Sequence, residues 1–282
     1  MKNKLIILIG MLSFFGLACS KNEQKQDAPA PDEPKKESLR VMTFNIHIGN
    51  PPGAAEGTVD LEASAAVIKA AKPDLLALQE VDRFTDRSGK TLDQAKALGE
   101  LTGMHVYFVP AMERSNGEYG NAILSKYPIL ESKRFTLEPE AGTDAEPRAL
   151  GVVQVELPNK QTLVFAVTHL DHKQESNRAL QSRTALNALK DYTKDPILLA
   201  GDFNMTPDSE NWAIWEKDFQ MGCSDCPYTF SVSNPYKTVD YILLSNQAKA
   251  YFSLVNYDVI PDQEASDHIP VLADLEYELE AK

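Results

Sequence analysis

Acidic, amide and histidine side chains recur at the ends of short apolar runs in this chain. The runs 39–45, 75–79, 162–169 and 197–201 each finish on such a residue or just before one. The residues at these and two similar positions are Asn45, Glu80, His169, Asp202, Asn204, Asp240, Asp267 and His268. Because the ends of packed strands are where a rigid scaffold presents its chemistry, we expect these side chains to meet in one site.

The oxygen-bearing members of this set predict a divalent cation. Glu80, Asp202 and Asp267, with the amide oxygens of Asn45 and Asn204, are hard donors that suit Mg²⁺ or Mn²⁺ better than zinc. Glu80 ends an apolar strand, where an unpaired buried carboxylate would be costly. We therefore predict one or two Mg²⁺ or Mn²⁺ ions at these residues.

The histidines predict proton transfer and stabilisation of negative charge. His268 follows an acid, and Asp240 is available to fix its tautomer, which suits catalysis near neutral pH. His169 and Arg148 are candidate donors to a phosphoryl oxygen. A cation, carboxylates and hydrogen-bond donors together are suited to the attack of water on phosphorus.

Nine strands and three helices are expected to position these side chains. We expect strands over 39–45, 75–79, 105–109, 120–125, 150–156, 162–169, 197–201, 241–244 and 271–275, and helices over 60–71, 92–101 and 176–190. Strands outnumber helices without strict alternation, and no long Gly/Ser linker divides the body. The pattern predicts one layered α/β domain over 39–282 rather than a barrel.

Seven motifs, taken in order, resemble the endonuclease/exonuclease/phosphatase superfamily, the group similar to deoxyribonuclease I. They are TFNIHIG, LLALQEVD, YGNAILSKYPI, VTHLDH, LLAGDFNMTP, VDYILLS and SDHIPVLADL. They run from about Leu39 to Leu275, and the stretches around them resemble a bacterial branch often called metal-dependent hydrolases. The resemblance implies an α/β (α+β) fold, a four-layer sandwich of two mixed β-sheets packed face to face and flanked by helices.

The resemblance also implies roles for the metal and phosphate ligands. Glu80 matches the principal metal-binding glutamate, Asn45 the asparagine near metal and phosphate, and Asp267 the acid that helps to hold a metal. Asp202 matches the aspartate that orients or deprotonates the attacking water, and Asn204 its phosphate-binding partner.

The histidines and neighbouring residues are assigned in the same way. His268 matches the essential histidine, Asp240 the acid paired with it, and His169 the histidine that donates to the phosphate. Further substrate contacts are expected from residues adjoining the motifs, namely His47, Tyr119, Asn121, Arg148 and His172. Three of these have structural alternatives, because the sequence YGN, which contains Tyr119 and Asn121, can form a tight turn and Arg148 a surface ion pair. Arg178 and Gln181, on one face of the third helix, are expected at the surface.

The N-terminal residues and the cysteines bear on where the protein is located. Cys223 and Cys226 cannot fill a tetrahedral zinc site by themselves, so outside the cytoplasm they predict a local disulfide. Residues 1–18 have the layout of an export signal, with two lysines before an apolar run. Gly16-Leu17-Ala18-Cys19 resembles the lipobox of bacterial lipoproteins, which implies lipidation of Cys19 and anchoring to the cell envelope; an ordinary cleaved signal is the alternative.

Residues 19–38 would then be the lipidated cysteine and its tether. The segment 20–38 has no Val, Ile, Leu or aromatic residue, so it cannot bury apolar surface and is expected to be disordered. The catalytic body would stay near a membrane, attached by lipid alone.

Charge bears on the substrate. The chain of 282 residues has 28 basic and 41 acidic side chains, a net charge of −13, which argues against a protein that coats nucleic acid. The loop 51–58 has no basic residue and the loop 138–146 is acidic. We therefore expect the substrate to be a small phosphate ester, a phospholipid headgroup or a sugar or inositol phosphate. We also expect the protein to be a monomer.

Three alternatives remain open. The first is an exported nuclease of the same fold. The second is a dinuclear zinc hydrolase, suggested by His169-Leu170-Asp171-His172, although five histidines make a two-zinc site hard to fill. The third is an inactive lipoprotein that binds a partner, which the intact set of candidate ligands argues against.

Overall fold

The protein is described here by a computed structural model that covers residues 35–55, 57–261 and 264–279. The expected signal peptide, Cys19 and most of the expected tether lie outside the described residues. The expectation of disorder is wrong for residues 36–38, because strand β1 (Lys36–Asn45) begins at Lys36. They pair with strand β12 (Val271–Glu278), and Lys36 Nζ lies 3.3 Å from Glu276 Oε2.

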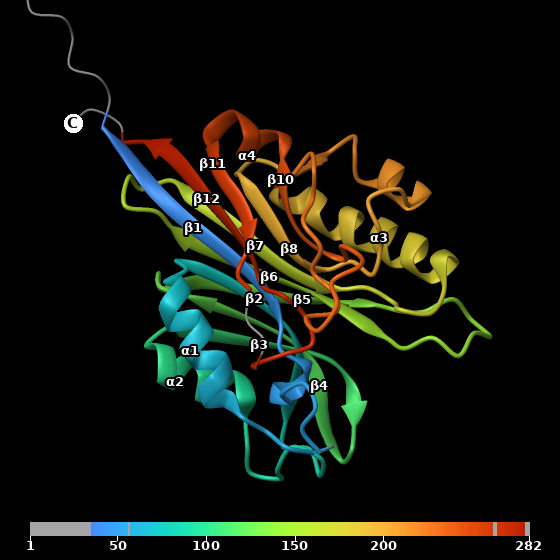
Figure 1. Ribbon diagram of the computed structural model, residues 1–282. Helices are drawn as coiled ribbons and strands as arrows, with labels where there is room; N and C mark the ends of the chain where they lie inside the picture. The colour runs from blue at the N-terminus through green and yellow to red at the C-terminus, as the bar shows by residue number, and fades with distance from the viewer. Residues whose placement is uncertain (1–34, 56, 262–263, 280–282) are drawn as a thin grey trace, which may run out of the picture. The chain divides into compact units, whose positions relative to one another are not determined.

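Two six-stranded sheets form the centre of the domain (Figure 1). The first sheet has the order β11 (Ser253–Val259), β12, β1, β2 (Leu75–Arg83), β4 (Gly117–Ser125) and β3 (His105–Arg114). The second has the order β5 (Ile129–Leu137), β6 (Arg148–Glu156), β7 (Thr162–His169), β8 (Ile197–Asp202), β10 (Asp240–Ser245) and β9 (Phe219–Met221). Both sheets are mixed, because β1 and β2 are parallel, as are β7 and β8, while the other pairs are antiparallel.

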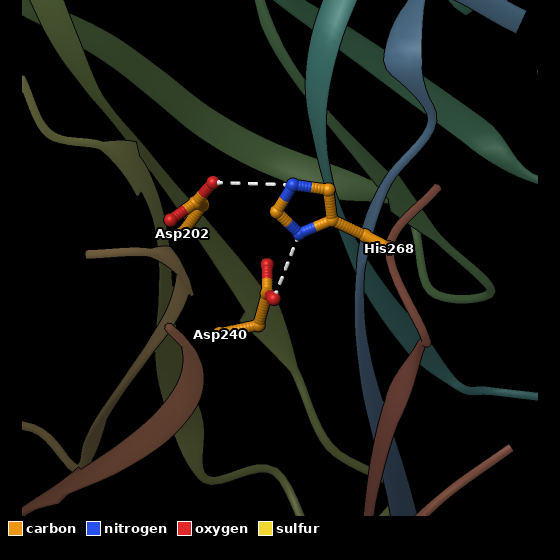
Figure 2. Close-up of side chains that lie close together, drawn as sticks. All are labelled: Asp202, Asp240 and His268. Carbon is orange, nitrogen blue, oxygen red and sulfur yellow. Dashed lines mark hydrogen bonds and ion pairs between the residues drawn. The ribbon is translucent and has the colours of Figure 1, made fainter. Parts of the chain in front are cut away.

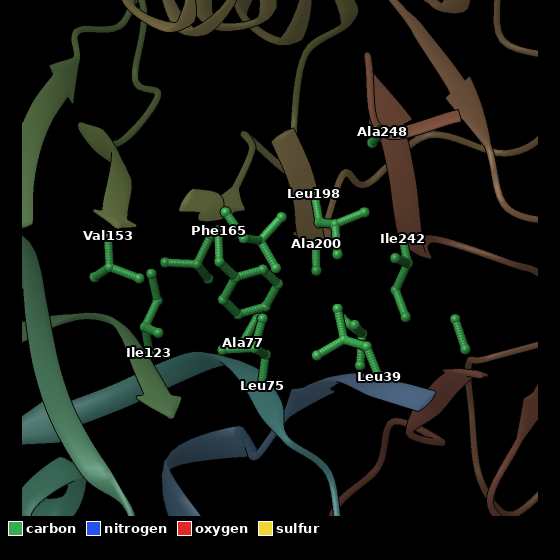
Figure 3. Close-up of a cluster of buried hydrophobic side chains, with 14 of the residues drawn as sticks. Leu39, Leu75, Ala77, Ile123, Val153, Phe165, Leu198, Ala200, Ile242 and Ala248 are labelled. Atoms are coloured by element: carbon green, nitrogen blue, oxygen red, sulfur yellow. The ribbon is translucent and has the colours of Figure 1, made fainter. Parts of the chain in front are cut away.

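The main hydrophobic core lies between the two sheets. Figure 3 shows Leu39, Leu75 and Ile123 of the first sheet facing Phe165 and Leu198 of the second, and all five are fully buried. Alternate residues of each strand point into this space, as the two-residue period of a strand requires. Removing this apolar surface from water is what holds the two sheets together.

Helices cover the outer face of each sheet, as Figure 1 shows. Helices α1 (Leu61–Ala71) and α2 (Gln94–Thr102) form a second core with the first sheet, and α3 (Glu175–Leu189) forms a third with the other sheet. Asp60 caps α1 by accepting a hydrogen bond from the Ala63 N–H, which satisfies one of its free amides. The expected four-layer sandwich is confirmed.

In the described residues all nine expected strands and three expected helices are present, with three further strands, one further α-helix and three short 3-10 helices. Strands β5, β9 and β11 lie at sheet edges, and a short helix, α4 (Asn246–Tyr251), follows β10. Strands β5 and β11 are largely exposed, and polar residues interrupt their apolar residues, so neither is a continuous apolar run of the kind used to find strands. In the described part of the chain no helix is long and apolar enough to cross a membrane.

The expected surface position of Arg178 and Gln181 is wrong. Both side chains are buried on α3. Gln181 Oε1 accepts a hydrogen bond from the Asp171 N–H at 2.8 Å, and the Arg178 guanidinium donates to the Asp171 carbonyl at 3.2 Å. These two residues fix the turn that follows β7, directly beside His169.

Candidate active site

The polar residues at the strand ends gather at one end of the sandwich. In the two parallel pairs, Asn45 lies opposite Gln79 and His169 lies opposite Asp202. Antiparallel pairing of β10 with β8 places Asp240 opposite Asp202. Parallel strands end at the same edge, so residues far apart in the chain meet there.

A bulge in β2 turns Glu80 toward the site. The pairing of β2 with β4 shifts between Leu78 and Val81, and Glu80 has a φ of 56°, in the left-handed region that most residues avoid. Such a conformation costs about 1–3 kcal/mol and persists where the surroundings hold it. The result is that Glu80 Oε1 lies 3.0 Å from Nδ2 of Asn45.

The side-chain amide of Asn45 joins both sheets. Its Nδ2 lies 3.0 Å from Glu80 Oε1, 3.2 Å from Asp202 Oδ2 and 3.5 Å from Nε2 of His268. Its Oδ1 accepts a hydrogen bond from the His47 N–H at 3.0 Å. Asn45 is only 1% exposed, so two carboxylates share one buried amide nitrogen, and the His268 ring lies beside it.

His268 and Asp240 form a buried pair (Figure 2). His268 Nδ1 lies 2.9 Å from Asp240 Oδ2, and its Nε2 lies 3.9 Å from Asp202 Oδ2. Burial alone would lower the pKa of His268, but the carboxylates of Asp240, Asp202 and Asp267 outweigh burial and raise the pKa to about 10. The imidazole is therefore positively charged at neutral pH, with Nε2–H facing Asp202.

Ser266 ties the histidine to the first strand. Its hydroxyl donates to the Asn45 carbonyl at 2.7 Å and accepts from the His268 N–H at 3.2 Å. Asp267 lies between them with Oδ1 3.8 Å from Nδ1 of His47. The segment before β12 is thus positioned by backbone and side-chain bonds to β1.

Asp202 is a buried carboxylate in an unfavourable setting. Burial, reinforced by the negative charge of Asp240, raises the pKa of Asp202. Its Oδ1 accepts from the Asn204 N–H at 2.9 Å, and its Oδ2 lies 3.5 Å from Nε2 of His169. Asn204 itself has a φ of 51°, a second left-handed residue at the site.

These residues fit a divalent cation. Asp202, Asp240 and His268 each offer a ligand atom, and these atoms lie within 4.8 Å of one another. Glu80 adds a carboxylate that shares the Asn45 amide with Asp202. Because Asp240 is hydrogen-bonded to His268, and Asn45 turns its amide nitrogen and not Oδ1 toward these carboxylates, Glu80 and Asp202 offer the better donor oxygens. A cation would offset the crowding of negative charge around Asp202.

Arg148 holds two histidines from behind. One guanidinium nitrogen lies 3.3 Å from Nδ1 of His169 and another 3.2 Å from Nδ1 of His172. Burial, then the positive charge of Arg148, lowers the pKa of His169 well below its ordinary value. A neutral His169 that accepts at Nδ1 carries its proton on Nε2, which faces Asp202.

The expected direct contact of Arg148 with substrate differs from its observed setting. The side chain is 3% exposed, and it pairs with Glu146 at 3.5 Å in addition to the two histidines. Its two terminal guanidinium nitrogens are used within the protein, whereas Nε has no hydrogen-bond partner among the described residues. The alternative of a surface ion pair is also wrong, since the residue is buried.

These side chains open into one cleft of about 510 Å³. The residues that line it, hereafter the active-site cleft, are His47, Glu80, Arg87, Arg114, Tyr119, Glu146, Arg148, His169, His172, Lys173, Asp202, Asn204, Phe230, Lys237, Val239, Asp267 and His268. Asn121 is not among them. It is buried, and its Nδ2 donates to the Ala149 carbonyl at 3.1 Å, which ties β4 to β6 across the two sheets.

Several lining residues were missed by the sequence analysis. Arg87 and Arg114 both lie over the ring of the expected pocket residue Tyr119, 5.3 and 5.5 Å from its centroid. Phe230 and Lys237 come from the loop before β10. All four lie outside the apolar runs or at their edges, so no strand-end signal marked them.

Cys223 and Cys226 form a disulfide near the base of that loop. The Thr238 hydroxyl lies 3.3 Å from the Cys226 carbonyl and 2.6 Å from the Pro227 carbonyl. The disulfide therefore lies beside the segment that leads directly into Asp240.

Comparisons with known proteins agree with this arrangement. Nocturnin from Xenopus laevis is 28% identical over 207 residues, 63% of this chain and 51% of nocturnin, so the chain spans about half the length of that relative. The uncharacterized protein YbhP from Escherichia coli K12 is 23% identical over 264 residues, 87% of this chain and 99% of YbhP.

Two solved structures show the same fold. An endonuclease/exonuclease/phosphatase from Beutenbergia cavernae has a TM-score of 0.69 and 26% identity over 86% of this chain and 72% of its own. A mannosyl-6-phosphatase from Bacteroides thetaiotaomicron has a TM-score of 0.68 and 20% identity over 84% of this chain and 99% of its own. The model of the Endonuclease/Exonuclease/phosphatase family matches residues 42–268, and the chain belongs to this family.

Proposed function

We propose that this protein is a divalent-metal-dependent phosphoesterase that hydrolyses a small phosphate ester by attack of water. The observation that carries the proposal is the Asn45 amide, which lies between Glu80 and Asp202 and beside the buried His268–Asp240 pair. This arrangement supports roles as metal donors, as a proton acceptor and as a cationic acid for side chains that lie around one point of a cleft. Mg²⁺ or Mn²⁺, held by Glu80 with Asn45 and Asp267 nearby, would polarise a phosphoryl oxygen.

Asp202 is suited to receive the proton of the attacking water. A raised pKa brings this carboxylate closer to neutral pH, where a general base works best. Asn204 holds one of its oxygens by a backbone hydrogen bond, which leaves Oδ2 facing the cleft between Asn45 and His169. The carboxylate therefore has a fixed direction before substrate arrives.

The two histidines are suited to opposite tasks. His268, positively charged and held by Asp240, can stabilise the charge that develops on phosphorus and donate a proton from Nε2. His169, neutral and held by Arg148, can donate its Nε2–H to a phosphoryl oxygen without adding charge. Both donors face Asp202.

A small ester is favoured over nucleic acid by the charges of the cleft. Three of its arginines and one lysine are paired with carboxylates, as at Arg87–Asp82 and Lys173–Asp144. Such pairs leave few free cations to follow a polyanionic backbone. The similarity to a mannosyl-6-phosphatase supports a phosphorylated small molecule as substrate.

The test is a panel of sugar phosphates, inositol phosphates, phospholipid headgroup esters and single-stranded DNA, assayed with Mg²⁺ for release of phosphate or alcohol. The proposal expects turnover of one small-ester class, abolished by EDTA. Turnover of DNA alone would favour the nuclease, and turnover of the same ester in EDTA would overturn the metal-dependent mechanism.

We also propose that the protein is exported and anchored to the cell envelope through a lipid on Cys19. Support comes from the charged start, apolar run and lipobox-like ending of residues 1–19. Labelled palmitate should be incorporated into the full chain and lost in Cys19→Ala. Equal labelling of both chains, or none of either, would contradict the anchor.

A further inference from the structure

The loop between β9 and β10 brings an unpaired cation to the active-site cleft. Lys237 Nζ lies 4.7 Å from the centroid of the Phe230 ring and 5.6 Å from that of Tyr236. Within residues 35–55, 57–261 and 264–279, no ion pair joins this lysine to a carboxylate. Its ammonium group lies on aromatic rings, and the residue lines the cleft together with Asp202 and His268.

Lys237 is unusual among the lysines and arginines of this cleft. Each of the others has a carboxylate partner in the described chain: Arg87 has Asp82, Arg114 and Arg148 have Glu146, and Lys173 has Asp144. Those partners neutralise the other cations. Among the described lysines and arginines of this cleft, Lys237 therefore has the charge that remains free to meet an anionic ligand.

The position of Lys237 is fixed relative to the catalytic histidine. Phe230 and Lys237 exchange two backbone hydrogen bonds, both of 3.1 Å, so the two residues face each other across a tight hairpin. The Phe230 ring packs against the His268 ring with centroids 4.9 Å apart. The Val232 N–H also donates to the Asp267 carbonyl at 2.8 Å.

The base of the hairpin is bound to the strand that carries Asp240. The Thr229 hydroxyl accepts from the Val239 N–H at 3.0 Å and from the Asp240 N–H at 3.2 Å. One network thus holds the His268–Asp240 pair and the wall that bears Lys237. A charge fixed in this way binds a ligand without a cost of ordering the loop.

We propose that Lys237, supported by Phe230, binds a second anionic group of the substrate, separate from the phosphoryl group that is hydrolysed. The inference rests on the proposed function and narrows its substrate class to phosphate esters with a further phosphate or carboxylate. An ammonium group with three donors suits either anion. The aromatic platform shields one side of the charge from water, which strengthens its attraction to an anion.

The test measures binding by calorimetry in Mg²⁺, on full chains carrying Asp202→Asn so that no probe is consumed. The probes are glucose 6-phosphate, glucose 1,6-bisphosphate and 6-phosphogluconate, which have the same 6-phosphate and differ in the group at carbon 1; the first two are pyranose rings and the third is an open chain. The proposal expects the bisphosphate, the phosphogluconate or both to bind about tenfold tighter than the monophosphate. Preference for one or both shows whether phosphate, carboxylate or either is accepted.

Lys237→Gln should reduce this preference to less than about threefold, and Lys237→Arg should keep it. Lys133→Gln is the matched control, because Lys133 Nζ also lies 4.7 Å from an aromatic ring, that of Phe135, outside the cleft. The control should keep the full preference. No preference in the starting chain, or a preference that survives Lys237→Gln, would overturn the inference.

Failure of this inference is separable from failure of the proposed function. If the unmodified chain hydrolyses phosphate esters but the Asp202→Asn chain binds the three probes equally, the second anion subsite is wrong and the phosphoesterase stands. If the anionic probes are preferred through Lys237 while no ester is hydrolysed, the hydrolytic function is wrong and the binding site stands.

Discussion

His268 Nδ1 and Asp240 Oδ2 lie 2.9 Å apart with both side chains buried, although the two residues come from different sheets. Asp240 opens β10 of the second sheet, and His268 precedes β12 of the first. This bond fixes the imidazole with Nε2–H toward Asp202. The proposed role of His268 as a proton donor depends on this orientation and on its positive charge.

Asp240→Asn should lower kcat by about 100-fold, because an amide keeps the shape of the side chain but removes the charge that keeps His268 protonated. The change in KM should be much smaller, since Asp240 does not line the cleft. Steady-state kinetics on the preferred ester check both values. A kcat within about threefold of the unmodified enzyme would contradict the assigned role of the pair.

The same pair makes the stability of the metal-free protein depend on pH. The pKa of His268 in the folded protein, about 10, is above the ordinary value of 6.5, so folding favours the protonated imidazole. The stabilisation is fully present below pH 6.5 and is lost as pH rises through 10. Denaturant unfolding in EDTA should therefore show the stability difference between the unmodified chain and Asp240→Asn shrinking from pH 6.5 to 10. A difference that is constant over this range would contradict it.

Asp202→Asn should stabilise the metal-free protein while abolishing activity. Burial raises the pKa of Asp202, so its charged form is disfavoured in the folded state at pH 8. Removing that charge should raise Tm by a few degrees in EDTA, and kcat should fall by at least about 100-fold because the proton acceptor is lost. Calorimetry and kinetics on one preparation measure the rise in Tm and the fall in kcat together. A lower Tm in the variant would show that Asp202 stabilises the fold.

Arg148→Lys should impair catalysis even though the charge is kept. One guanidinium reaches both His169 and His172, whereas a single ammonium cannot match that fork. We expect kcat to fall by about 10-fold or more, as for other residues that orient a functional ligand. Nitrogen NMR should also show mixed His169 tautomers in the variant and proton on Nε2 alone in the parent. An unchanged tautomer would contradict the positioning role.

The strand-end residues could be predicted because an apolar run that stops on a polar residue is visible in sequence. Asn45, Glu80, His169 and Asp202 all carry that signal, and the structure brings them together. Asn121 has a similar signal but faces the space between the sheets. In a strand buried on both sides, periodicity does not tell the cleft from the interior.

The cationic walls of the cleft could not be predicted in this way. Lys237 and Arg87 lie in loops, where no period relates one residue to the next, and only the folded chain shows their partners. The exposed edge strands β5 and β11 were missed for a related reason, because polar residues interrupt their apolar residues and leave no continuous apolar run. Long-range pairing, and not local preference, makes them strands.

Removing and restoring the metal tests whether hydrolysis depends on a divalent cation held by Glu80. The chain is stripped with EDTA, and hydrolysis of the preferred ester is measured as Mg²⁺ is added back, for the unmodified chain and for Glu80→Gln. The account predicts no turnover without metal, full recovery with Mg²⁺, and a Mg²⁺ requirement raised about 10- to 100-fold in the variant, since one charged ligand is lost. Full activity after stripping, or the same Mg²⁺ requirement in both chains, would contradict it.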